Sequence, residues 1–166
     1  TSFQLAPHQL FLKNLFNIDT PYNGILIFHG VGVGKTCSGV SIAENFKHLE
    51  NKTIILASEK IQVGWKKNIF DPKKGDNQCT GEEYKYEEDK YERNIEGVTE
   101  KRIKEFYEMS GYLSFANKVK GLLEDNLKII PSNEIQIRKE KEIEIIKKNY
   151  SNRVLIIDEV HNIRND

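Results

Sequence analysis

The residues best suited to bind a phosphate are positions 29–36, which read His-Gly-Val-Gly-Val-Gly-Lys-Thr. They follow the apolar residues 24–28, which predict a buried strand, and they lead into a predicted helix that begins at Lys35. Backbone N–H groups of a glycine-rich loop can surround a phosphate, and the helix N-terminus adds a partial positive charge. Lys35 is expected to reach the β- and γ-phosphates, and the Thr36 hydroxyl is expected to bind Mg²⁺. The predicted nucleotide-binding residues of this segment are Gly30, Val31, Gly32, Val33, Gly34, Lys35, Thr36 and Cys37.

One position departs from the phosphate-loop pattern G-x-x-x-x-G-K-[ST]. The pattern has glycine where this chain has His29. An alternative interpretation is an ordinary tight turn between a strand and a helix, with an exposed lysine. The context favours the phosphate site, because an apolar run precedes the loop and an amphipathic helix follows it. The helix carries Cys37, Val40, Ala43 and Phe46 at three-residue spacing, so this face is expected to pack on a sheet.

A second set of reactive side chains follows the aliphatic residues 154–157, which predict the last buried strand. The segment reads Asp158-Glu159-Val160-His161. At the carboxyl end of a parallel strand, Asp158 could bind Mg²⁺, and Glu159 could orient and deprotonate an attacking water. Parallel strands would bring these carboxylates to the same sheet edge as the phosphate loop. The alternatives are a solvated strand end that caps a helix and, for His161, an exposed histidine at a helix start.

Alternating strands and helices are predicted to position these motifs. Strands are expected at 24–28, 53–57, 106–109 and 154–157, and helices at 7–17, from Lys35 onward, at 61–69, at 114–124 and at 138–148. Aliphatic strands that alternate with helices indicate an α/β fold, in which helices cover both faces of a parallel sheet. In the last helix, Ile143 and Ile146 are expected to face inward. Residues 71–104 are polar and highly charged, and they are predicted to form a surface excursion outside the core.

The composition limits the class of protein. The chain has 166 residues, which suits one domain, and its 25 basic residues balance 25 acidic ones. Zero formal charge argues against a tail-type nucleic-acid binder but is compatible with a motor that holds a strand in a local groove. The two cysteines form no metal-binding framework; Cys37 is expected to be a small buried residue, and Cys79 to lie in a polar loop. No apolar run approaches the roughly 20 residues of a membrane span.

Together these motifs resemble the first motor domain of superfamily 2 helicases. The resemblance rests on the phosphate loop, the Asp-Glu-x-His box, the upstream Gln9 and the downstream Trp65. Residues 26–37 and 158–164 are similar to the branch found in large cytoplasmic DNA viruses. That branch includes poxvirus-type early transcription factor and nucleoside triphosphate phosphohydrolase subunits. The resemblance covers most of residues 3–70 and 105–166.

The resemblance implies that residues 1–166 form the N-terminal part of a RecA-like P-loop NTPase domain, as a fragment of a larger helicase. It implies ATP and Mg²⁺ as cofactors, and ATP hydrolysis that drives a helicase or translocase on DNA or RNA in viral transcription. The implied partners are the nucleic acid, a second RecA-like domain of the same protein and a viral RNA polymerase, with no membrane. The implied location is the virion and the host cytoplasm. Because an arginine finger is missing, the fragment alone is expected to hydrolyse ATP poorly.

The predicted catalytic residues are Lys35, Asp158, Glu159 and His161, and the predicted metal ligands are Thr36 and Asp158. Gln9 resembles the residue that reads adenine in the family; its alternative is a glutamine on a helix surface. Trp65 is expected in the core. The candidates for contacts with a nucleic-acid backbone are Lys60, Lys66, Lys67, Tyr112 and Ser114, whereas Phe115 is expected in the core.

Two other classes of function stay open. A P-loop ATPase that acts on protein, such as an AAA+ or secretion motor, would share the phosphate loop and the acidic box but would need neither Gln9 nor His161. A non-catalytic nucleotide-binding module could instead bridge transcription components. The presence of Lys35, Thr36 and the two carboxylates of the box argues against this last interpretation.

Overall fold

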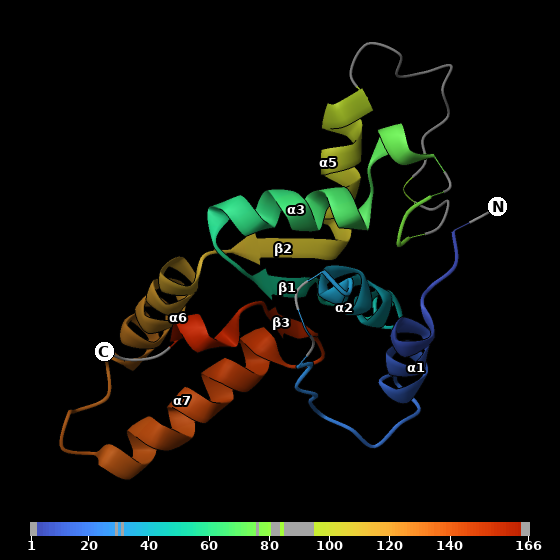
Figure 1. The fold of residues 1–166 in the computed structure, drawn as a ribbon. Helices are drawn as coiled ribbons and strands as arrows, with labels where there is room; N and C mark the ends of the chain where they lie inside the picture. The colour runs from blue at the N-terminus through green and yellow to red at the C-terminus, as the bar shows by residue number, and fades with distance from the viewer. Residues whose placement is uncertain are drawn as a thin grey trace.

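The computed structural model describes residues 3–28, 30, 32–75, 77–80, 84 and 95–163. Three parallel strands form a sheet in the order β2-β1-β3, and helices pack around it (Figure 1). The strands are β1 (Thr53–Leu56), β2 (Tyr107–Ser110) and β3 (Leu155–Ile157). The helices are α1 (Pro7–Leu15), α2 (Lys35–Glu44), α3 (Glu59–Ile69), η1 (Pro72–Lys74), α5 (Ile95–Phe106), α6 (Tyr112–Leu127), α7 (Ile135–Tyr150) and η3 (Val160–Ile163). The predicted α/β class with a parallel sheet is confirmed.

The central strand β1 sets the register of the sheet. Ile55 lies opposite Met109 of β2 and opposite Ile156 of β3. All four residues of β1 are buried, as expected for a strand that is paired on both edges and covered on both faces. Because the strands are parallel, their carboxyl ends meet at one edge of the sheet. Residues that follow β1, β2 and β3 are therefore brought together there.

One predicted strand is wrong. Residues 24–28 run as an irregular segment between α1 and α2, and Leu26 and Phe28 are 77% and 93% exposed. A parallel strand needs a neighbour with which to exchange hydrogen bonds, and neither edge strand of the described sheet pairs with this segment. The last predicted strand forms, but it is an edge strand rather than a buried one. Leu155 and Ile157 of β3 are exposed, whereas Ile156 between them is half-buried.

The core lies between α2, β1, α3 and α5. Helix α2 is buried on all sides from Cys37 to Ala43, so its burial exceeds the single predicted apolar face. The ten buried residues of the main core cluster come from these four elements, from β2 and from connecting segments: Val40, Ala43, Ile55, Ala57, Trp65, Ile69, Phe70, Tyr84, Ile103 and Tyr107. On α1, Leu12 is buried as predicted, but Phe11 is exposed. Phe16 stacks on Phe46 at a centroid distance of 5.7 Å.

Part of the predicted surface excursion belongs to the core, so this prediction is wrong for its buried residues, whereas Lys73, Lys74 and Gly75 are exposed. Tyr84 is fully buried and packs against Phe70 and Phe106, with ring centroids 6.0 and 5.9 Å away. Its hydroxyl donates to Glu44 at 2.8 Å, and the Tyr107 hydroxyl donates to the same carboxylate oxygen. Residues 95–106 form α5, in which Ile103 is buried. Residues 76, 81–83 and 85–94 of the excursion lie outside the described residues.

A disulfide joins Cys37 to Cys79, with the two Cα atoms 5.6 Å apart. Cys37 is buried and Cys79 lies in a loop, as expected, but the bond between them was not predicted. Cys37 follows Thr36 in the first turn of α2, and Cys79 belongs to the loop after η1. The bond ties this loop to the start of the helix that follows the phosphate loop.

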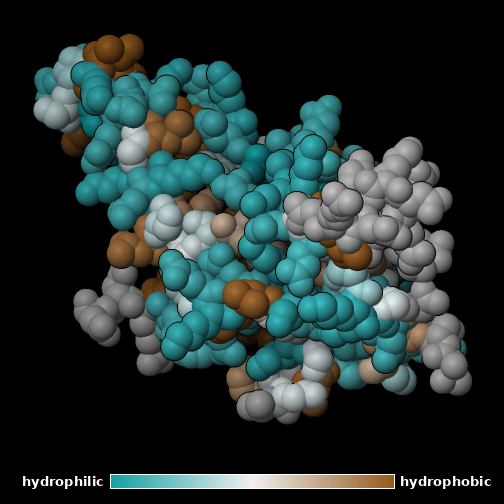
Figure 2. All heavy atoms as spheres, turned by 90° about the horizontal axis from the view of Figure 1, so that it is seen from above, coloured by the Kyte–Doolittle hydropathy of each residue, from teal (hydrophilic) through white to brown (hydrophobic). Residues whose placement is uncertain are grey.

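Helices α6 and α7 form a hairpin that extends away from the sheet (Figure 1). Residues 128–134 connect them and include Pro131, which is unfavourable inside a helix. Ile145 is the buried isoleucine of α7, whereas Ile143 is 55% exposed, so the predicted inward face was wrong in part. Figure 2 shows brown, apolar patches on the projecting part of the molecule, and the exposed isoleucines of the hairpin are Ile129, Ile135, Ile137 and Ile143.

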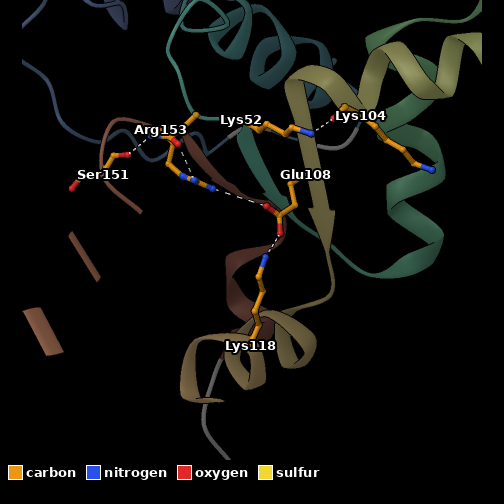
Figure 3. A network of polar contacts seen from close by, with 7 residues as sticks. Lys52, Lys104, Glu108, Lys118, Ser151 and Arg153 are labelled. Atoms are coloured by element: carbon orange, nitrogen blue, oxygen red, sulfur yellow. Dashed lines mark hydrogen bonds and ion pairs between the residues drawn. The ribbon is translucent and has the colours of Figure 1, made fainter. Parts of the chain in front are cut away.

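A polar network joins α6 and the residues before β3 to strand β2 (Figure 3). Glu108 of β2 accepts from Lys118 of α6 at 2.5 Å and lies 4.0 Å from the Arg153 guanidinium, just before β3. Arg153 also donates to Asn51, which in turn donates to the carbonyl of Ser151. The network therefore joins the chain before β1 to the chain before β3. Among the described residues, no helix is both long and apolar enough to cross a membrane.

The disulfide predicts the thiol content of the protein. Unfolded without a reductant, the chain should show no reactive thiol, whereas after reduction it should show two. Cys79→Ser should lower the free energy of unfolding by about 4 kcal/mol, because the bond closes a long loop in the unfolded chain. Ellman titration and urea unfolding would measure these effects. In excess dithiol the variant and the unaltered chain should differ little, which is the control. Two free thiols in the untreated protein would contradict the disulfide.

The buried phenols that face Glu44 predict a loss of stability at alkaline pH. Burial and the Glu44 charge raise the pKa of Tyr84 and Tyr107 far above that of a free phenol. Their stabilising effect is complete below pH about 10, where unfolded tyrosine begins to ionise, and it declines as pH rises further. Tyr84→Phe should cost about 1.5–3 kcal/mol at neutral pH, because Glu44 loses a donor, and should make the alkaline decline shallower.

Urea unfolding at neutral pH and above pH about 10 would measure both effects of Tyr84→Phe. The matched control is Tyr150→Phe in α7, whose hydroxyl makes no hydrogen bond within the part of the chain that the structure describes. Tyr150→Phe should change neither the free energy of unfolding at neutral pH nor its decline at alkaline pH by a comparable amount. Equal alkaline slopes for the unaltered chain and the Tyr84 variant would contradict the role given to this phenol.

Candidate nucleotide site

The phosphate loop reaches α2 through left-handed backbone. Gly32 has φ = 82° and Gly34 has φ = 79°, a region that side chains with a Cβ rarely adopt. Gly34 is the N-cap of α2, so the N–H groups of the first turn point toward the loop. Lys35 and Thr36 are the first two residues of the helix, as predicted. Of the remaining predicted loop residues, His29 and Val31 lie outside the described residues.

Two side chains of helix α1, Gln9 and His8, contact this loop. Gln9 is 7% exposed; its amide Nε2 donates to the Gly34 carbonyl at 3.2 Å, and its Oε1 accepts from the Ala6 N–H at 2.9 Å. The His8 ring lies beside it, with Nε2 3.0 Å from the Val33 carbonyl. A Cβ at position 34 would lie 2.6 Å from the Gln9 amide nitrogen. Glycine is favoured at 34 by its φ, and a Cβ there would also displace the Gln9 amide.

The acidic box follows β3 at the carboxyl edge of the sheet. The Asp158 N–H donates to the Leu56 carbonyl of β1 at 3.0 Å, which extends the ladder by one residue. The hydroxyl of Tyr112, the first residue of α6, donates to the Asp158 carbonyl. The backbone of Asp158 is therefore held from both neighbouring elements, and its half-buried carboxylate points toward α3, where it accepts from Trp65.

Glu159 and His161 form a pair beside Asp158. Glu159 has φ = 50°, a left-handed conformation that costs about 1 kcal/mol or more for a residue with a side chain. Its Oε2 lies 3.3 Å from Nδ1 of His161 in η3, and its carbonyl accepts from the Asn162 N–H at 2.9 Å. The two carboxylates of the box therefore make different contacts, Asp158 with Trp65 and Glu159 with His161.

The two halves of the site are joined by Trp65. Its indole Nε1 donates to Asp158 Oδ2 at 2.8 Å, and its ring contacts α2 at Gly39. Trp65 lies in the core, as expected from the sequence, and is 3% exposed. Neither of its two contacts was predicted. A signal was present, because a buried indole N–H needs an acceptor and carboxylates are strong acceptors.

Of the lysines proposed to contact a nucleic-acid backbone, Lys66 is engaged within the protein. Its Nζ lies 2.8 Å from Glu100 of α5. Hydrogen bonds from Lys66 and Lys104 lower the pKa of Glu100 below its ordinary value. Phe115 of α6 contacts Tyr150 of α7 edge-on at 5.6 Å, but it is only half-buried and lies outside the main core cluster, so the expected core position is wrong.

The donor set at the site fits Mg²⁺ chemically. Mg²⁺ prefers hard oxygen ligands, and it is usually bound by one or two carboxylates or hydroxyls together with phosphate oxygens. The Thr36 hydroxyl at the start of α2 and the Asp158 carboxylate at the end of β3 are such ligands. Within the described ranges, no group of three or more His, Cys, Asp or Glu side chains could hold a metal alone. A cation here would depend on phosphate oxygens to complete its coordination.

Gly39 tests the contact between α2 and Trp65. A Cβ on Gly39 would lie 2.6 Å from the far edge of the Trp65 ring. Gly→Ala inside a helix ordinarily stabilises it by about 0.5–1 kcal/mol, but overpacking costs about 1–3 kcal/mol. Gly39→Ala should therefore lower the free energy of unfolding measured in urea. Gly121→Ala in α6, where nothing lies within 4 Å, should raise it. Stabilisation by both substitutions would contradict the packing.

Comparisons with known proteins agree with this site. The ResIII family model, described as the res subunit of type III restriction enzymes, matches residues 3–166. Two candidate ATP-dependent RNA helicases of Acanthamoeba polyphaga mimivirus are 32% and 31% identical to the chain over 98% of its length. A candidate helicase of Invertebrate iridescent virus 3 is 29% identical over 96% of the chain.

The chain spans 15%, 25% and 15% of the lengths of these three relatives. No solved structure matches it significantly. The family match covers nearly the whole chain and agrees with the parallel α/β fold. The chain belongs to the ResIII family of superfamily 2 helicase domains.

Proposed function

We propose that this domain binds ATP and, in the full-length protein, hydrolyses it in a Mg²⁺-dependent reaction that drives a helicase or translocase along nucleic acid. The observation that carries the proposal is the pairing of a glycine-rich helix N-terminus with the Asp158-Glu159-Val160-His161 box at the carboxyl edge of the sheet. Family membership and the helicase names of the viral relatives support it. A helix N-terminus favours anions, and carboxylates at the strand end suit metal and water.

The chemistry of each side chain indicates its role in this reaction. The loop N–H groups from Gly30 to Thr36 would bind the phosphates, and Lys35 would contact the β- and γ-phosphates. Thr36 and Asp158 would hold Mg²⁺, which would neutralise charge on the phosphate oxygens. Glu159 would orient and deprotonate the attacking water. His161, which contacts Glu159, would help to hold that carboxylate in place.

Gln9 is proposed to read the polar edge of adenine. Both ends of its amide make contacts within the protein, at Gly34 and Ala6. Its contact with the phosphate loop supports a role at the nucleotide, because a base bound beside α1 would meet the same side chain. Adenine would then replace Gly34 or Ala6 as a hydrogen-bond partner of the Gln9 amide.

The partners and location stay proposals. The nucleic acid is DNA or RNA, and a second RecA-like domain of the same protein would complete the cleft. A role in viral transcription, with a viral RNA polymerase as partner in the virion and host cytoplasm, is proposed from the resemblance to viral transcription subunits. The competing function is a P-loop ATPase that acts on protein. A non-catalytic module is disfavoured by the presence of Lys35, Thr36, Asp158 and Glu159.

ATP hydrolysis by the full-length protein tests this function. With Mg²⁺, single-stranded DNA or RNA should stimulate turnover. Glu159→Gln should lower kcat by about 10²–10⁴-fold, as expected for loss of a general base, while ATP binding is retained. Lys35→Ala should abolish turnover through weaker phosphate binding. A matched control is Lys120→Ala, a lysine on the exposed side of α6 that should leave turnover unchanged. Turnover that ignores every nucleic acid would favour the protein-directed ATPase instead.

A further inference from the structure

The indole of Trp65 makes one polar contact that crosses the fold. Its Nε1 donates to Asp158 Oδ2 at 2.8 Å, although the residues lie 93 positions apart in the chain. Trp65 is 3% exposed, so water cannot replace this acceptor without opening the core. An indole N–H is a donor only, and a donor to a charged acceptor makes one of the stronger hydrogen bonds of a protein.

The opposite edge of the same ring rests on α2. The ring atom Cη2 lies 2.6 Å from the place where a Cβ on Gly39 would be, so only glycine permits this approach. Gly39 lies one turn after Lys35 in the helix that begins at the phosphate loop. A tryptophan side chain has only two rotatable bonds, and this one is packed within the core cluster. A shift of α2 relative to β3 would therefore act directly on the hydrogen bond.

The rest of Asp158 is held by the backbone. Its N–H donates to Leu56, and its carbonyl accepts from the Tyr112 hydroxyl. With Oδ2 bound to Trp65, the oxygen that no described residue contacts is Oδ1. A group that fixes one oxygen of a ligating carboxylate determines where the other oxygen points.

We propose that Trp65 is a positioning residue of the nucleotide site: its N–H orients Asp158 for Mg²⁺, and its ring transmits the position of the phosphate-loop helix to that carboxylate. This inference rests on the proposed nucleotide function and deepens it. Trp65 would act through Asp158, without touching ATP itself. Nucleotide binding at the N-terminus of α2 would then be sensed at the end of β3 through one rigid side chain.

Binding of ATP to the 166-residue chain, measured by calorimetry with Mg²⁺ and with EDTA, tests the inference. Trp65→Phe keeps an aromatic ring in the core but removes the donor. It should leave ATP affinity in EDTA unchanged and lower the gain in affinity from Mg²⁺ by about 10–100-fold, as for other partners of metal ligands. The matched control is Tyr150→Phe, an aromatic change in α7 that should leave both affinities unchanged. Equal Mg²⁺ dependence in Trp65→Phe and the unaltered chain would overturn the inference.

Fluorescence gives a second measurement that keeps Trp65 in place, because the chain contains a single tryptophan. Asp158→Ala should shift the emission of the nucleotide-free chain, since the indole loses its charged acceptor, whereas Asp125→Ala on exposed α6 should not. An unchanged spectrum in Asp158→Ala would also overturn the inference. Failure of the unaltered chain to bind ATP in either buffer is a different result, and it would overturn the proposed function together with the role given to Trp65.

Discussion

The pairing of β1 with strands on both of its edges is the constraint on which the rest of the structure depends. Ile55 lies between Met109 and Ile156, and the hydrogen-bond ladder continues past the strand ends. Ala57 donates to Ser110, and Asp158 donates to Leu56. Because all three strands are parallel, the ladder brings the segments after β1, β2 and β3 to one edge. The position of the acidic box is thus set by the backbone of a buried strand.

The phosphate loop and the start of α2 are held by packing rather than by strand pairing. Helix α2 is buried from Cys37 to Ala43, and it contacts α1 on one side and α3 on another. Gln9 fastens the loop to α1, and Trp65 connects α2 to Asp158. Helices α1, α2 and α3 therefore hold the phosphate loop in place by packing. This arrangement lets a nucleotide at α2 influence the end of β3 through contacts already present.

The failed predictions share one physical cause. A local sequence pattern does not show which distant strand or side chain a segment will contact in the fold. Residues 24–28 have the composition of a strand, but a strand forms only where another strand accepts its hydrogen bonds. Tyr84 occurs in a highly charged stretch, yet its ring fills the core and its hydroxyl finds Glu44 across 40 positions. Cys37 and Cys79 gave no pattern when considered singly, and only the fold brings their Cα atoms within 5.6 Å.

The sequence by itself determined the chemistry and most of the elements. The order of glycines before Lys35, the aliphatic strands and the box from Asp158 to His161 predicted a parallel α/β domain with a nucleotide site, because these signals are local. Element boundaries at α2, β1, β2 and β3 agree with the predicted ranges within one or two residues. Tertiary structure alone decided which strands pair, which polar groups are buried and that Trp65 meets Asp158. Those contacts join residues that are distant in sequence, and only the shape of the packed core selects among the partners that each side chain could have.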